Sequence, residues 1–133
     1  MANVVNTSGK RKSAVARAVI KDGSGSVRVN NVPIGIFSPE LARLKIMEPL
    51  GLAPEMAAKV DINVNVTGGG YMGQAEASRT AIAKGLVEFF NNEELEMMFK
   101  HYDRSLLISD ARRKLPKKPL GRGARKKKQK SYR

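Results

Sequence analysis

The chain has 133 residues and a formal net charge of +13, so it is large enough for one compact domain with an extension. It contains no cysteine, which excludes disulfides and thiolate zinc ligands, and it has no run of about 18 apolar residues that could cross a membrane. The N-terminus lacks the apolar core of a signal peptide, so these features together predict a soluble, cytoplasmic protein that binds polyanions.

The first third of the chain alternates between apolar and polar residues, which is typical of β-strands. Strands or hairpins are expected at residues 3–7, 14–21 and 27–35. In the second of them Ala14, Ala16 and Ala18 share one face, and side chains this small allow a helix to pack closely against the sheet. Asn30 and Asn31 mark the bend of the third segment.

A helix is expected to begin at Ser38 and Pro39 and to end at Pro49 and Gly51. Serine can cap free backbone N–H groups and proline suits a first helical turn, whereas proline and glycine further along interrupt a helix. The apolar stripe expected to face the core is Leu41, Leu44 and Met47. A second, short helix is expected at Pro54.

Residues 59–66 alternate strictly and predict the most regular strand, with its valines and isoleucine facing inward. A long helix is then expected over residues 71–91. Its apolar stripe comprises Ala75, Ile82, Leu86 and Phe89 or Phe90. Arg79 and Lys84 lie off this stripe. A further helical turn or two is expected to face the body with Leu95, Met98 and Phe99. The order of elements predicts an α+β or α/β body.

The positive charge is concentrated at the end of the chain. Residues 111–133 hold 12 of the 25 Lys and Arg residues and none of the 12 Asp and Glu residues, which leaves a net charge of +1 for residues 1–110. The apolar pattern also stops after Ile108. We therefore expect a near-neutral globular body at residues 1–110 and an extended basic C-terminal tail at residues 111–133, which orders on a polyanion. The tail has no Trp, Phe or Cys, so nucleic acid is favoured over a membrane surface.

The run Gly68–Gly73 fits G-x-G-x-x-G between a predicted strand and a predicted helix. No second parallel strand with a ribose-binding acid follows, and Gln74-Ala75 stands where a phosphate-binding loop needs Lys and Ser or Thr. We therefore expect no nucleotide cofactor. Two interpretations stay open, namely a phosphate contact by the N–H groups of Gly69 and Gly70, and a plain tight turn with positive φ angles.

Catalytic and metal-binding patterns are weak in this sequence. His101 is the only histidine and has no Cys partner, and the acidic residues are scattered without the clustering that a metal site requires. Glu93, Glu94 and Glu96 fit a solvated helix face. We expect no enzyme activity, no cofactor and no metal.

Basic residues outside the tail gather in the loop between the first two strands and on the long helix. They are Lys10, Arg11, Lys12, Arg17, Arg79 and Lys84. Side chains of this kind contact the RNA backbone, which fixes the position of a protein without reading sequence. We therefore expect a phosphate-binding edge on the body.

Three segments together resemble one family. They are SGKRKSAVARAVI, TGGGYMGQAEASRTAIAKGL and a basic tail that ends in Arg. In this order they resemble small-subunit ribosomal protein nine, the S-nine family, over essentially the whole chain. The ending from Asp110 to Arg133 is similar to the archaeal and eukaryotic branch. Tyr132 stands where bacterial members more often have Lys, so a role for a penultimate Lys is not carried over.

The resemblance implies a structural constituent of the small ribosomal subunit head, with small-subunit ribosomal RNA, peptidyl-site transfer RNA and neighbouring ribosomal proteins as partners. It implies a two-layer fold similar to the second domain of ribosomal protein S-five, with a sheet of about four strands backed by helices and a left-handed βαβ crossover. In the tail, ribosomal RNA contacts are expected at Arg112, Arg113, Lys114, Lys117, Lys118, Arg122, Arg125, Lys126, Lys127 and Lys128. The tip expected near transfer RNA is Lys130, Ser131, Tyr132 and Arg133.

Two rival interpretations remain. An unrelated protein that compacts RNA or DNA would use the same arm, and it would bind duplex DNA as well as ribosomal RNA. A small phosphate-handling enzyme would use the glycine loop, and nucleotide would stabilise it against heat.

Overall fold

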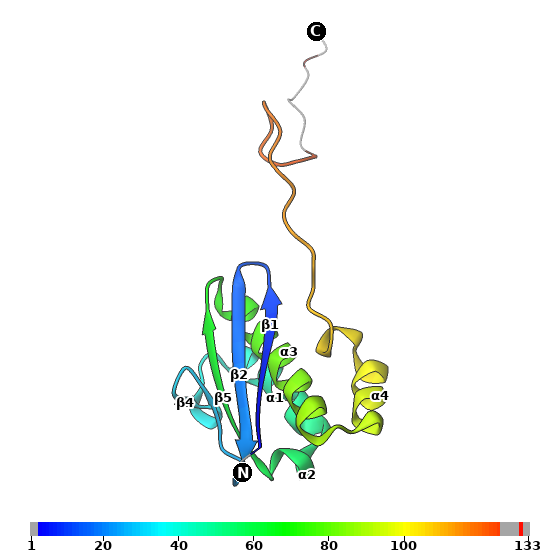
Figure 1. Cartoon of the computed structure of the whole chain (residues 1–133). Coiled ribbons are helices and arrows are strands. Elements are labelled where there is room, and N and C mark those ends of the chain that lie inside the picture. The colour runs from blue at the N-terminus through cyan, green and yellow to red at the C-terminus, as the bar shows by residue number, and fades with distance from the viewer. Residues whose placement is uncertain (1–2, 126–130, 132–133) are drawn as a thin grey trace.

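The computed structural model describes residues 3–125 and residue 131. Over these residues the chain forms a layered body, from which the C-terminal tail leads away (Figure 1). The elements in chain order are β1 (Val4–Arg11), β2 (Ala14–Asp22), β3 (Val27–Val29), β4 (Val32–Pro33), η1 (Ile34–Ile36), α1 (Glu40–Leu52), α2 (Pro54–Ala57), β5 (Val60–Thr67), α3 (Tyr71–Phe90), α4 (Glu93–Tyr102) and η2 (Arg104–Leu106).

The described strands form one open sheet in the order β1-β2-β5-β3-β4. β2 is antiparallel to both β1 and β5, whereas β3 is parallel to β5, so the sheet is mixed. The parallel pair places α1 and α2 in the crossover between β3 and β5. The predicted two-layer α+β class is confirmed, and the strand beyond the expected four is the two-residue β4. The left-handedness of the crossover stays a prediction.

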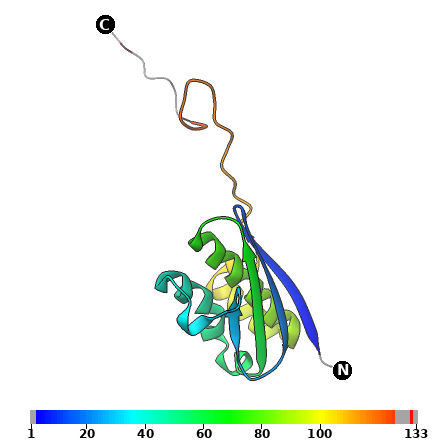
Figure 2. The same cartoon turned by 90° about the vertical axis from the view of Figure 1, so that its left-hand side faces the viewer.

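The helices cover one face of the sheet and leave the other face open (Figure 2). The core lies between the sheet and α3, and the predicted small face of β2 is confirmed because Ala14, Ala16 and Ala18 are fully buried there. The approach of α3 to the sheet is so close that a Cβ atom on Gly9 would lie 2.3 Å from the carbonyl oxygen of Ala77. Small side chains on β1 and β2 therefore set the spacing between the two layers.

The predicted inward stripe of α1 is wrong. Leu41, Leu44 and Met47 are exposed, with exposed fractions of 70%, 52% and 40%. The residues that α1 buries are Ala42, Ile46 and Pro49. Both sets repeat at helical spacing, and packing against α3 decides which of them faces the core. The helix ends at Leu52, one residue beyond the predicted stop at Gly51, but Pro49 does not interrupt it and its ring is buried in the core.

The segment after α3 is confirmed as helical, with one exception on its inner face. Asn92 caps α4, since its Oδ1 accepts hydrogen bonds from the backbone N–H groups of Glu94 and Leu95 at 2.9 and 3.3 Å. Leu95 and Phe99 are buried as predicted, whereas Met98 is 43% exposed. α4 therefore packs through two side chains and ends where the chain turns towards the tail.

Candidate nucleic-acid interface

The tail leaves the body at the outer edge of β1, through a segment that we call the tail root (residues 109–112). Arg11 and Asp110 form an isolated parallel β-bridge, and the backbone N–H of Lys10 donates to Oγ of Ser109 at 3.3 Å. The Arg11 guanidinium donates from Nε to Glu76 at 2.6 Å and from Nη1 to Asp110 at 2.7 Å. One arginine thus joins β1, α3 and the start of the tail.

Asp110 is the centre of the tail root. It accepts hydrogen bonds from the Arg112 backbone N–H at 2.9 Å and from the Arg112 guanidinium at distances down to 2.6 Å. These Arg112 bonds, assisted by the charge of Arg11, hold the pKa of Asp110 well below its usual range. Asp110 therefore stays ionised at neutral pH and keeps both arginines bound.

Beyond the tail root, the described part of the tail extends away from the body (Figure 1). Its predicted RNA-contact residues are exposed and form no ion pair with a described carboxylate. They are Arg113, Lys114, Lys117, Lys118, Arg122 and Arg125. Other predicted contacts lie outside the described residues, namely Lys126, Lys127, Lys128, Lys130, Tyr132 and Arg133, while Ser131 is exposed. The described tail is therefore a run of cations whose charge the protein itself does not neutralise.

The glycine turn before α3 packs against the turn between β1 and β2. Gly68 and Gly69 have φ angles of +80° and +66°, so the tight-turn interpretation is confirmed. A cavity of about 450 Å³ is lined by Lys12, Gly69 and Gly70, among others. No side chain caps the N-terminus of α3 at Gly70, so its first backbone N–H groups are without a side-chain acceptor. Lys12 and these groups lie at one end of the body and together favour an anion there.

Arg79 lies inside the body, so the expectation that it lies off the buried face of the helix is wrong. Its side chain is 5% exposed, and its Nε and Nη2 atoms are each 2.8 Å from a carboxylate oxygen, of Glu48 and Asp103 respectively. The contact with Glu48 is an ion pair without hydrogen-bond alignment, whereas that with Asp103 is a hydrogen bond. The bond from Arg79 is the main reason that the pKa of Asp103 is lowered to about 2. Arg79 therefore joins α3 to α1 and η2.

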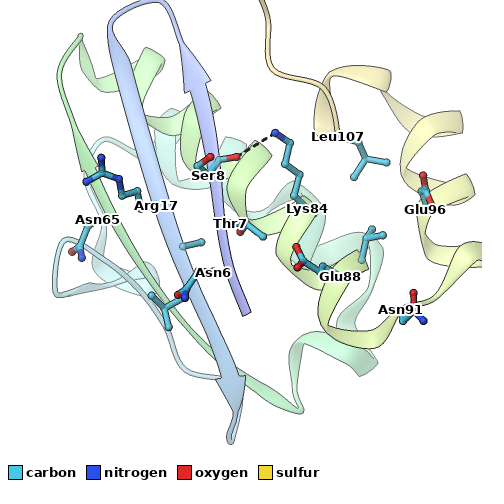
Figure 3. Close-up of a pocket in the computed structure, with 13 residues that line it drawn as sticks. Asn6, Thr7, Ser8, Arg17, Asn65, Lys84, Glu88, Asn91, Glu96 and Leu107 are labelled. Carbon is cyan, nitrogen blue, oxygen red and sulfur yellow. Dashed lines mark hydrogen bonds between the residues drawn. The ribbon is translucent and has the colours of Figure 1, made fainter. Parts of the chain in front are cut away.

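Lys84 and Arg17 lie on opposite sides of β1, around a groove of about 840 Å³ (Figure 3). Nζ of Lys84 donates to the backbone oxygen of Ser8 at 3.2 Å from the helical side. Arg17 projects from the uncovered face of the sheet, where Asn65 is its cross-strand neighbour. The sequence predicted both cations, but only the fold shows that a single edge strand separates them.

The predicted basic residues of the body therefore separate into three groups. Lys10, Lys12 and Arg17 are exposed, whereas Lys84 is half-buried and donates to the backbone oxygen of Ser8. Arg11 and Arg79 are held by carboxylates that the sequence analysis did not single out, because those partners lie 24 to 99 positions away along the chain. No local pattern marks such pairs, so no signal in the sequence could have found them.

Other kinds of site find no support in the described part of the chain. No group of three or more His, Cys, Asp or Glu residues there could hold a metal ion, and His101 is exposed on α4. None of the described helices is long and apolar enough to span a membrane.

Comparison with known proteins extends over nearly the whole chain. A family model described as "Ribosomal protein S9/S16" matches residues 9–133. "Small ribosomal subunit protein uS9" of Thermoplasma volcanium is 57% identical over 129 residues, which is 97% of this chain and 98% of the relative. The proteins of the same description from Picrophilus torridus and Halobacterium salinarum are 49% and 52% identical, and cover 100% and 98% of this chain and 100% and 99% of their own lengths. The matched region includes the glycine turn and the basic tail.

Proposed function

The chain belongs to the ribosomal protein S9/S16 family, and from this premise we propose that it is a structural protein of the small ribosomal subunit that binds small-subunit ribosomal RNA and approaches the peptidyl-site transfer RNA. Proteins of this family are structural parts of the ribosome and not enzymes. The observation that carries the RNA-binding proposal is the tail, whose exposed cations are fixed to the body at the tail root.

The tail is the main contact with ribosomal RNA in this proposal. Its lysines and arginines displace counterions condensed on the RNA, and this release favours binding strongly at low salt. The tail root supports the role, because Arg11 and Arg112 hold Asp110 and so define the point at which the arm leaves β1. Arginines further along can bind phosphates bidentately, whereas lysines act as point charges.

The body supplies a second set of phosphate contacts at the same end of the molecule. Lys12 lines the cavity described above together with Gly69 and Gly70, at the uncapped N-terminus of α3, and Lys10 is exposed near the end of β1. A phosphate there would meet a cation and the positive end of the α3 dipole. This arrangement orients the body on the RNA, so that the tail enters from a fixed direction.

The end of the tail is proposed to reach the peptidyl-site transfer RNA. This step rests on the family resemblance of Lys130, Ser131, Tyr132 and Arg133 and on their place after the basic run. Tyr132 offers a ring that can stack on a base, and Arg133 offers a guanidinium for a phosphate.

The proposal for ribosomal RNA is tested by the salt dependence of binding. Full-length protein and residues 1–110 are titrated with small-subunit ribosomal RNA in a filter-binding assay at several salt concentrations. The body alone retains the buried core, so it is expected to fold. Its plot of log affinity against log salt is expected to be much shallower, by about 0.7 to 0.9 for each RNA phosphate that the missing tail would have neutralised. Equal slopes would mean that the tail is not the main phosphate contact.

A competition assay separates this proposal from a general nucleic-acid compacting role. Duplex DNA of equal charge is added to the complex of full-length protein with ribosomal RNA. We expect the RNA to stay bound at DNA concentrations that would displace it from a binder driven by charge alone.

A further inference from the structure

The sheet face that points away from the helices carries a surplus of positive charge. Side chains alternate along each strand, and the burial pattern shows which of them point outward. The cations on this face are Lys10, Arg17, Lys21 and Arg28. Asp61 is the carboxylate among the described outward side chains, and its Oδ1 already accepts hydrogen bonds from the backbone N–H groups of Ser24 and Ser26, both at 3.1 Å. An approaching anion would therefore meet mostly positive charge.

Amides and hydroxyls stand between these cations in regular rows. One row across β1, β2 and β5 is Ser8, Arg17 and Asn65. The next row, which continues onto β3, is Asn6, Val19, Asn63 and Arg28. Neighbouring strands lie about 4.8 Å apart, so a row over four strands spans roughly 14 Å. Figure 3 shows Asn65 beside Arg17 on this face.

We infer that this open sheet face is a second RNA-docking surface, which binds the sugar–phosphate backbone of a double-stranded RNA segment across its minor groove. The inference rests on the proposed function and names a surface for it that is separate from the tail. The minor groove of A-form RNA is wide and shallow and presents 2′-hydroxyl groups between the phosphate rows. Asparagine amides both donate to and accept from hydroxyls, while arginines bind the phosphates on either side.

Single-stranded RNA fits this face less well. Proteins that bind unpaired bases on a sheet stack them on aromatic side chains. The outward side chains of β1, β2, β3 and β5, all of which the structure describes, include no aromatic residue. The chemistry of the face therefore favours backbone contacts over base stacking.

A protein partner also fits this face less well. The cores of protein–protein interfaces are rich in aromatic residues, Met and other apolar side chains and poor in Lys. Here the apolar outward residues are valines, and two of them, Val15 and Val19, are already half-buried between polar neighbours. The positive charge and the rows of asparagine amides on this face therefore favour RNA over a protein partner.

The groove along β1 continues this surface around the edge of the sheet. Arg17 and Asn65 line it on the sheet side, whereas Glu88 and Glu96 line it on the helical side. These two carboxylates outnumber Lys84 on the helical side, and Lys84 already donates to the backbone oxygen of Ser8, so the RNA is expected to stay on the side of Arg17. This difference in charge between the two sides of the groove places the limit of the docking surface at β1.

The test uses full-length protein with two exposed arginines of the face changed together, Arg17→Gln and Arg28→Gln. The control, Arg43→Gln with Arg104→Gln, also removes two arginine charges, but from the helical layer, where Arg104 is exposed and Arg43 is half-buried beside Glu40. In titrations with small-subunit ribosomal RNA, the salt slope of the sheet-face variant is expected to fall by about 2, roughly one for each arginine. The control slope is expected to match the wild type.

An uncharged variant, Asn63→Ala with Asn65→Ala, tests for direct contact. It is expected to weaken binding of ribosomal RNA without a change in salt slope. In direct titrations, unrelated duplex RNA is expected to bind the wild type more tightly than this variant, whereas duplex DNA, which lacks the 2′-hydroxyl, is expected to bind both equally. Thermal unfolding of each variant checks that the fold is intact, as expected for the sheet-face variants, whose changed side chains are exposed.

The possible outcomes separate this inference from the proposed function. An equal decrease of slope in the sheet-face variant and the control would show that only total charge matters and would overturn the inference. If both sheet-face variants bind ribosomal RNA like the wild type, the inference is overturned. If residues 1–110 still give a shallower salt slope in that case, the proposed function stands. Normal binding to naked RNA with failure to join subunits reconstituted with other ribosomal proteins would identify a protein as the occupant. No binding of ribosomal RNA by the wild type would contradict both.

Discussion

Arg79 is a basic residue whose charge is neutralised inside the protein. Its guanidinium is 2.8 Å from Glu48 on α1 and 2.8 Å from Asp103 before η2, and only 5% of its side chain is exposed. Removing one partner of a buried ion pair leaves the other charge without compensation. At the scale of single residues, a positive charge in this sequence can therefore serve either the fold or the RNA.

We expect Arg79→Met to lower the free energy of unfolding by about 3 kcal/mol, because Glu48 and Asp103 then lack their shared cation. Its salt slope for ribosomal RNA is expected to equal that of the wild type. Urea denaturation and RNA titration of the same preparation measure the two quantities. A slope reduced by about 1 with unchanged stability would instead make Arg79 an RNA contact, as the sequence pattern predicted.

Asp103 gives the body a defined response to acid. Its pKa is about 2 in the folded protein, against an ordinary value of 3.8, because Arg79 and then Ser105 donate hydrogen bonds to it. Its stabilising effect is therefore complete above about pH 4 and is lost as the pH falls through 2. Because its side chain is 42% exposed, solvent screening reduces this effect to about 1 kcal/mol.

Asp103→Asn is therefore expected to lower stability by about 1 kcal/mol at pH 7 and to have a much smaller effect at pH 2, where about half of the folded molecules carry a protonated Asp103. Urea unfolding at both pH values measures the change. An equal decrease at the two pH values would show that the carboxylate charge is not what stabilises this contact.

At the scale of elements, the contact between β1 and α3 depends on Gly9. A Cβ atom at this position would lie 2.3 Å from the Ala77 carbonyl oxygen and 2.8 Å from the Ala81 nitrogen, and both of these are backbone atoms of a well-packed helix. The edge strand that carries the tail root is thus held to the helix by the smallest possible residue.

Gly9→Ala is expected to lower the free energy of unfolding by about 2 to 3 kcal/mol, because strand and helix must move apart. The control is Gly35→Ala, where a Cβ atom would meet no other atom within 4 Å. Chemical denaturation of both variants measures the difference. Similar stabilities for the two would show that β1 can shift away from α3 at little cost.

At the scale of the whole molecule, we expect the basic part of the tail to hold the protein on ribosomal RNA and the tip to contact transfer RNA. Deleting residues 129–133 removes the proposed tip but leaves most of the tail's basic residues, Arg112 to Lys128. Assembly into small subunits is therefore expected to be nearly normal, while transfer RNA dissociates faster from the peptidyl site. The dissociation rate of transfer RNA from purified subunits measures this. The control is Lys117→Gln, which removes one charge from the tail before the tip. Unchanged dissociation after the deletion would contradict the tip assignment.

The sequence by itself determined the features that depend on neighbouring residues. Strict alternation determined β5, three consecutive glycines determined the turn before α3, and a basic segment without any acidic residue determined the tail. These features follow from local backbone chemistry and from charge that cannot be buried, so they can be predicted without a three-dimensional structure. The family resemblance had the same local origin, because it rested on short motifs in order.

Only the tertiary structure decided which of several locally equivalent possibilities is used. α1 carries two apolar stripes, and packing on α3 buries the one with Ile46 instead of Leu44. Arg11 and Asp110 meet across 99 positions of sequence, and this pair sets the point at which the tail leaves the body. The open face of the sheet exists because the helices all lie on the other side. Such contacts depend on the relative placement of distant elements, which the order of residues within any one segment does not reveal.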